Sequence, residues 1–171
     1  MKRQLRGIRI ALFWGLLATY LIGAMIPATA LWFDPGEVEF SDAIAGRRPP
    51  ALRFSRTIHR PTVIRYSVVV REVIPGGHSG LVACEALGGP FTYQPVSGPL
   101  IGKDLSWWAP GDPRCSHLPP GTYLTETVWT VVAPLGDLLP ERLRWLEWLI
   151  PAKRVHRTSE PFTILPRKGA D

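Results

Sequence analysis

The chain has 171 residues, which is enough for one domain of ordinary size, and its composition (46% hydrophobic, 20% charged) is typical of a globular protein. Its net charge of +6 is concentrated at the start: the first nine residues supply +4, and the rest carries 16 basic against 14 acidic side chains. A body so nearly neutral lacks the charge typical of nucleic-acid binding, so we expect no nucleic-acid partner.

Residues 10–33 contain no charged side chain. The stretch of 17 residues from Ile10 to Ile26 is longer than the ~7–15 residues of a cleavable signal core. All 24 residues together can cross about 30 Å of hydrocarbon as a helix. Trp32 and Phe33 at the far end suit the aromatic belt of a membrane interface. The sequence therefore predicts a transmembrane anchor over residues 10–33.

A signal peptide stays open as the alternative, because the small residues of Ala28-Thr29-Ala30 fit a cleavage site behind an apolar run. Cleavage there would release a soluble binding domain. Both interpretations export the body, since basic residues precede the apolar run and acidic residues such as Asp34 and Glu37 follow it. We expect a cytoplasmic N-terminus and a periplasmic or extracellular C-terminal domain.

Cys84 and Cys115 are the two cysteines of the chain. In an exported domain, an isolated pair most often forms a disulfide, which would stabilise the fold by about 3–4 kcal/mol. Two buried free thiols are the alternative. A zinc site is disfavoured because Cys115-Ser116-His117 lacks the usual ligand spacing, and we expect neither metal nor cofactor.

Alternation of apolar and polar residues predicts strands after a linker at residues 34–50, which itself has one possible short strand at 37–41. The expected strands cover residues 52–59, 63–73, 81–87, 123–133 and 162–165, with a further candidate at 105–109. Turns rich in Pro and Gly separate them. Several short strands of this kind indicate a mainly β chain folded as an antiparallel sandwich.

The stretch LPPGTYLTETVWTVV, residues 118–132, resembles the corner before a late strand of immunoglobulin-like sandwiches. The resemblance covers fifteen residues and implies the fold only. Cys115 lies eight residues before Tyr123, whereas the antibody pattern has its second cysteine two residues after the tyrosine. Any bridge here must therefore differ from the antibody one.

Residues 138–154 depart from the β pattern. Pro140 suits a first helical position and Pro151 ends the run, so we expect a helix over residues 139–150. Its apolar stripe consists of Leu139, Leu143, Leu146 and Ile150. The side chains beyond that stripe form a candidate interaction surface of Arg144, Trp145, Trp148 and Leu149. Exposed Trp beside Arg is typical of interfaces, whereas simple capping of the sandwich is the alternative.

Local motifs for catalysis are weak. Gly77-His78-Ser79-Gly80 resembles a nucleophile elbow, but the motif fails because residue 81 is Leu. A secreted or periplasmic hydrolase with a site around His78 or His117 remains the enzymatic alternative, since active sites can assemble from distant residues. Our main expectation is a non-enzymatic, single-pass membrane protein that binds another membrane or envelope protein.

The expected organisation is a cytoplasmic tail (1–9), an anchor (10–33), a linker (34–50), a β-sandwich (51–166) with a helix at 139–150, and a C-terminal tail (167–171).

Overall fold

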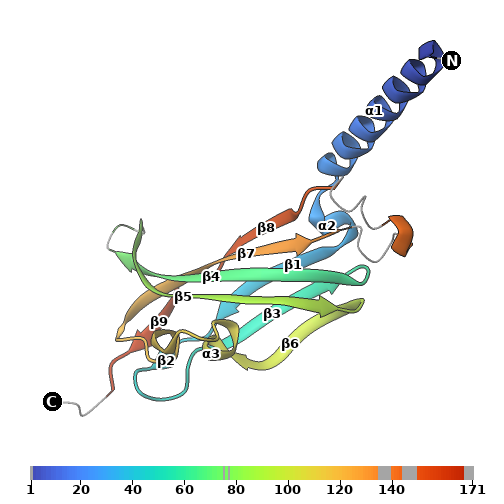
Figure 1. Ribbon diagram of the computed structural model, residues 1–171. Helices are drawn as coiled ribbons and strands as arrows, with labels where there is room; N and C mark the ends of the chain where they lie inside the picture. Colours follow the sequence, from blue (N-terminus) through green and yellow to red (C-terminus); the bar gives the residue numbers. More distant parts are fainter. Residues whose placement is uncertain (1, 75, 77, 135–139, 144–149, 168–171) are drawn as a thin grey trace.

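A computed structural model describes residues 2–74, 76, 78–134, 140–143 and 150–167. Helix α1 projects from a body of β-sheets, and the C-terminus lies at the opposite end (Figure 1). In chain order the elements are α1 (Lys2–Met25), α2 (Ala28–Leu31), β1 (Phe33–Phe40), β2 (Ala43–Ile44), β3 (Ala51–Ile58), β4 (Thr62–Ile74), β5 (His78–Tyr93), β6 (Val96–Asp104), α3 (Leu105–Trp108), the 3-10 helix η1 (Pro113–Ser116), β7 (Gly121–Val132), β8 (Lys153–Thr158) and β9 (Phe162–Leu165).

The strands form two sheets, so the chain is mainly β as predicted. One sheet has the order β1-β3-β6 and is antiparallel throughout. The other has the order β2-β9-β7-β4-β5 and is antiparallel except for the parallel β2–β9 pair. Strand β8 also pairs with β7, next to β9 along the same edge. One edge strand of the first sheet is therefore β6, and one edge strand of the second is β5. These two strands follow each other in the chain.

Aromatic side chains join the two sheets. Phe54 of β3 stacks on Trp129 of β7 with ring centroids 5.7 Å apart. The ring of Trp108 lies edge-on to both, 4.9 Å from Phe54 and 5.7 Å from Trp129. Every second residue of β7 from Tyr123 to Val131 is buried, as the alternation of its sequence predicts. This packing between the sheets is compatible with a β-sandwich.

Residues 34–50 are not simply a linker, because β1 and β2 lie there. Phe33, Val38 and Phe40 of β1 are buried in the core, and β1 pairs with β3. The register of this pair shifts between Pro35 and Val38, which breaks the alternation in the sequence and hides the first half of the strand. The predicted strand at 37–41 is therefore longer and starts at Phe33.

Residues 105–109, a candidate strand, instead begin with helix α3. The Asp104 carboxylate accepts hydrogen bonds from the Trp107 backbone at 3.0 Å and from the Ser106 hydroxyl at 2.6 Å. This is the N-cap pattern that starts a helix, and it overrides the strand preference of two adjacent tryptophans.

The apolar helix starts and ends earlier in the chain than the predicted span of 10–33. It ends at Met25, just before Pro27, and Trp32 and Phe33 are buried in the body with 2% and 3% of their surface exposed. They therefore belong to the protein core and not to an interfacial belt. Among the described residues, the helical stretch Gly7–Met25 is long and apolar enough to span a membrane.

Candidate functional site

The last turn of α1 is bound to the body by Lys153, the first residue of β8. The Lys153 Nζ donates hydrogen bonds to the carbonyl oxygens of Gly23 at 2.5 Å and Ala24 at 2.8 Å. Carbonyls in the last turn of a helix have no partner within the helix, and a cation is favourable there. Burial lowers the pKa of the Lys153 side chain, because only 7% of the surface of this residue is exposed. The lysine is thus both a helix cap and a link between α1 and β8.

Close packing reinforces this link. A Cβ atom at Gly23 would lie 2.7 Å from Cγ1 of Ile150, so the Ile150 side chain rests directly on the glycine. Gly23 is buried, while most of the helix is exposed. A larger residue at Gly23 would push the helix away from the body.

Residues 28–33 are also part of the body. The Trp32 indole Nε1 donates to the Pro134 carbonyl at 2.8 Å. The Trp32 carbonyl in turn accepts from the His59 backbone at 3.0 Å, and the His59 ring Nε2 lies 3.0 Å from the Thr29 carbonyl. Ala28 is buried. The possible cleavage site after the exposed Ala30 therefore lies between the buried residues Ala28 and Trp32.

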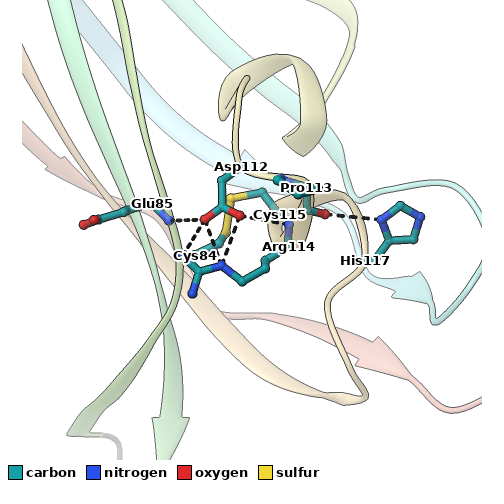
Figure 2. The surroundings of a disulfide bond; sticks show 7 residues. All are labelled: Cys84, Glu85, Asp112, Pro113, Arg114, Cys115 and His117. Carbon is teal, nitrogen blue, oxygen red and sulfur yellow. Dashed lines mark hydrogen bonds and ion pairs between the residues drawn. A yellow bond between two sulfur atoms is a disulfide. The ribbon is translucent and has the colours of Figure 1, made fainter.

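The disulfide predicted from the sequence is present. Cys84 of β5 and Cys115 of η1 are bonded, with their Cα atoms 5.5 Å apart, and both are buried (Figure 2). The bond fixes η1 against β5, the edge strand of its sheet. It therefore holds the connection between β6 and β7 in place.

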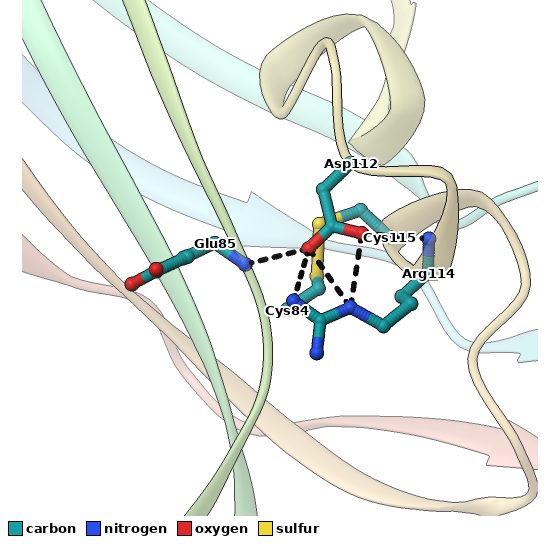
Figure 3. Close-up of polar contacts among 5 residues, drawn as sticks. All are labelled: Cys84, Glu85, Asp112, Arg114 and Cys115. Atoms are coloured by element: carbon teal, nitrogen blue, oxygen red, sulfur yellow. Dashed lines mark hydrogen bonds and ion pairs between the residues drawn. A yellow bond between two sulfur atoms is a disulfide. The ribbon is translucent and has the colours of Figure 1, made fainter.

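Asp112 lies beside the disulfide and holds the residues around it by hydrogen bonds (Figure 3). Its Oδ2 accepts from the Glu85 backbone N–H at 3.2 Å and from Arg114 Nη2 at 2.8 Å, and its Oδ1 accepts from the Arg114 backbone at 3.0 Å. The hydrogen bond from the Arg114 side chain is the main cause that lowers the pKa of Asp112 to about 2. The Glu85 N–H belongs to an edge strand, where a strand of another chain could otherwise accept its hydrogen bond. Asp112 accepts that bond instead.

The sulfurs of Cys84 and Cys115 and a carboxylate oxygen of Asp112 all lie within 4.8 Å of one another. Such a group could hold a metal ion only if the sulfurs were thiolates. Both sulfurs are committed to the disulfide, so the arrangement serves the structure of the loop.

His117, a candidate for catalysis, lies beside the disulfide. Its Nδ1 is 3.2 Å from the Pro113 carbonyl, and the ring points away from Asp112 (Figure 2). It lines an open cavity of about 550 Å³ together with Glu72, Arg114 and Tyr123. Among the hydrogen bonds of the described residues, none joins His117 to a carboxylate or a hydroxyl group. The other candidate, His78, begins β5, and its side chain lies outside the described residues.

The candidate interaction surface of Arg144, Trp145, Trp148 and Leu149 also lies outside the described residues. Of the expected helix 139–150, residues 141–143 form a 3-10 turn in which the Leu143 N–H donates to the Pro140 carbonyl at 2.7 Å.

Sequence reasoning missed the role of Lys153. A signal was present, because Lys153 and Val155 alternate with Arg154 and His156, which places the lysine on the inner face of a strand. No local pattern could name its partner, which lies about 130 residues earlier in α1.

Comparison with protein-family models finds no match for this chain, and comparison with curated proteins finds none either.

Proposed function

We propose that the chain is a non-enzymatic, single-pass membrane protein whose exported immunoglobulin-like domain binds another membrane or envelope protein. The observation that carries this proposal is the bond between Lys153 and the end of α1. A signal peptide is removed from the mature protein, whereas here the last turn of α1 and residues 28–33 complete the packing of the body. The helix is therefore better explained as a retained anchor.

Two observations support export of the body. Basic residues precede the apolar part of α1, and acidic residues follow it, which favours a cytoplasmic N-terminus. The Cys84–Cys115 disulfide is of the kind that persists in oxidising compartments outside the cytoplasm.

The strand order supports an immunoglobulin-like sandwich. The chain alternates between the sheets so that β3 pairs with β6 in one sheet and β4 pairs with β7 in the other. This is the Greek-key relation of such sandwiches. The Tyr123 hydroxyl donates to the Pro119 carbonyl at 3.0 Å, which matches the tyrosine corner of that fold. The disulfide differs from the antibody pattern because it joins edge strand β5 to η1.

Exposed apolar residues on the two edge strands support a binding role. Leu81 and Leu87 on β5 and Ile101 on β6 are each 81% exposed. Large apolar side chains on edge strands attract partners, and soluble monomers keep such surfaces small. Asp112 bonds only the Glu85 N–H in the middle of β5, so the side chains of Leu81 and Leu87 stay accessible.

The experiment places a photo-reactive amino acid at Leu87 or Ile101 of the full chain in its native membrane. The control position is the exposed Glu160 between β8 and β9, on the side of β7 away from β4 and β5. We expect both edge positions to form a crosslink to one and the same protein, while Glu160 gives none. Adducts that are equally frequent at all three positions, or absent at all of them, would contradict the binding role.

A further inference from the structure

The end of the body that meets α1 carries a group of arginines on its surface. We call Arg60, Arg65, Arg142 and Arg154 the anchor-end arginines. Arg154 follows Lys153 on β8 and pairs with Thr130, and Arg65 pairs with Thr130 from the other side. Because Lys153 points inward to α1, its neighbour Arg154 points outward, and Arg65 shares that outer face.

The other two anchor-end arginines lie in turns at the same end. Arg60 follows His59, whose ring contacts the Thr29 carbonyl of α2. Arg142 lies in the turn after Pro140, and Figure 1 shows this turn at the same end of the body as the base of α1. The four arginines thus lie at the end of the body from which α1 leaves.

Within the part of the chain that the structure describes, few acidic groups lie near these arginines. Among the described residues, none of the four forms an ion pair with a carboxylate. Asp34 at this end is occupied by Arg157 at 3.6 Å, which leaves Glu141 as an exposed acidic neighbour. The opposite end of the body carries both signs: Asp42 and Glu160 lie in turns there, and Asp42 shares a cavity with Arg47 and Arg48. What sets the anchor-end arginines apart is their position at the end of the body that is bound to α1.

We propose that the anchor-end arginines bind the phosphate groups of anionic phospholipids in the leaflet from which α1 emerges. The proposal rests on the proposed function, because it requires α1 to lie in a membrane. Lys153 and the buried residues Ala28, Trp32 and Phe33 fix this end of the body to the helix, so the arginines stay near the bilayer surface. Guanidinium groups match phosphate oxygens in geometry and charge, so a basic surface held there favours anionic headgroups.

The test uses the full chain in dodecyl maltoside micelles and follows its unfolding temperature while phosphatidylglycerol or phosphatidylcholine is added. A lipid that binds the folded body raises the unfolding temperature. The test variant carries Arg65→Ser, Arg142→Ser and Arg154→Ser. The control variant removes the same charge from exposed sites away from α1, with Arg47→Ser, Arg48→Ser and Arg167→Ser. All variants keep the basic residues before α1, so lipid binding by that tail is the same in each.

Phosphatidylglycerol should raise the unfolding temperature of the natural chain and the control variant, and phosphatidylcholine should not. The test variant should bind phosphatidylglycerol roughly a hundredfold more weakly, since each arginine near a surface contributes about fivefold. Circular dichroism without added lipid shows whether the variants fold alike.

If phosphatidylglycerol raises the unfolding temperature of the test and control variants equally, the proposal is wrong. It is also wrong if both lipids raise the unfolding temperature of the natural chain equally. A rise that depends on a co-purified acidic protein and not on added lipid would overturn it too. These failures differ from failure of the anchor, which shows as a chain that needs no detergent to stay in solution.

Discussion

The Nζ atom of Lys153 lies 2.8 Å from the carbonyl oxygen of Ala24, 129 residues earlier in the chain. This contact turns two separate features, an apolar helix and a β body, into one unit. It fixes the orientation of the body relative to α1, and the proposed roles of α1 as an anchor and of the anchor-end arginines depend on that orientation.

Replacing Lys153 by Met should destabilise the protein by about 1–3 kcal/mol, because it removes charge-assisted hydrogen bonds and leaves the carbonyls of Gly23 and Ala24 without a buried donor. Arg154→Met on the same strand is the matched control, and it should change the free energy of unfolding by less than about 0.5 kcal/mol. Thermal unfolding in detergent measures both. Equal effects of the two substitutions would show that Lys153 does not cap the helix.

Replacing Cys84 and Cys115 together by Ala should lower the free energy of unfolding by about 3–4 kcal/mol, the value expected for a loop of this length. The loop between the two cysteines spans 31 positions, and without the bond η1 is no longer fixed to β5. Urea unfolding of the natural and double-mutant chains gives the difference. Mass measurement under non-reducing conditions is the check, since two free thiols in the natural protein would refute the bond.

Acid should weaken the contact around Asp112. The pKa of this carboxyl is about 2 in the folded chain, mainly because of the Arg114 side chain, against an ordinary value of 3.8. Between these two pH values the unfolded chain binds the proton and the folded chain does not, so stability falls as pH drops through the window and is complete above it. Asp112→Asn should flatten this part of a plot of unfolding temperature against pH. A slope that stays the same in the variant would assign the acid sensitivity to other groups.

Strands and disulfide could be predicted from the sequence because each depends on local or compositional signals. Period-two alternation identifies β4 and β7, and two cysteines in an exported chain predict their own pairing. Strands β2, β6 and β8 were not predicted, and β1 and α3 were predicted only in part or as another element. The register shift after Pro35 breaks the alternation of β1, and the Asp104 side chain starts a helix where two tryptophans favour a strand.

The contact between α1 and the body could be predicted only in part. The inward position of Lys153 follows from alternation along β8, but its contact with α1 is a long-range relation that no local pattern encodes. Trp32 was assigned to the membrane interface because of its place after an apolar run, although the structure uses it in the core. An aromatic residue at the end of a helix suits both environments, so the sequence does not distinguish them.

The candidate surface around Trp145 and Trp148 stays a prediction. If it binds a partner, the double substitution Trp145→Ala and Trp148→Ala should leave the unfolding temperature almost unchanged while binding to the partner or to liposomes falls, since exposed tryptophans are common hot spots. Loss of the folded state in the double mutant would instead mean that both side chains fill the core.

The most direct test of the account is the mass of the protein that remains in the membrane pellet after a carbonate wash. We predict a single species with the full mass of 19.0 kDa, because the end of α1 and residues 28–33 are bound to the body and are retained with it. Recovery of a soluble species that begins at Leu31 would contradict the anchor and the membrane role built on it.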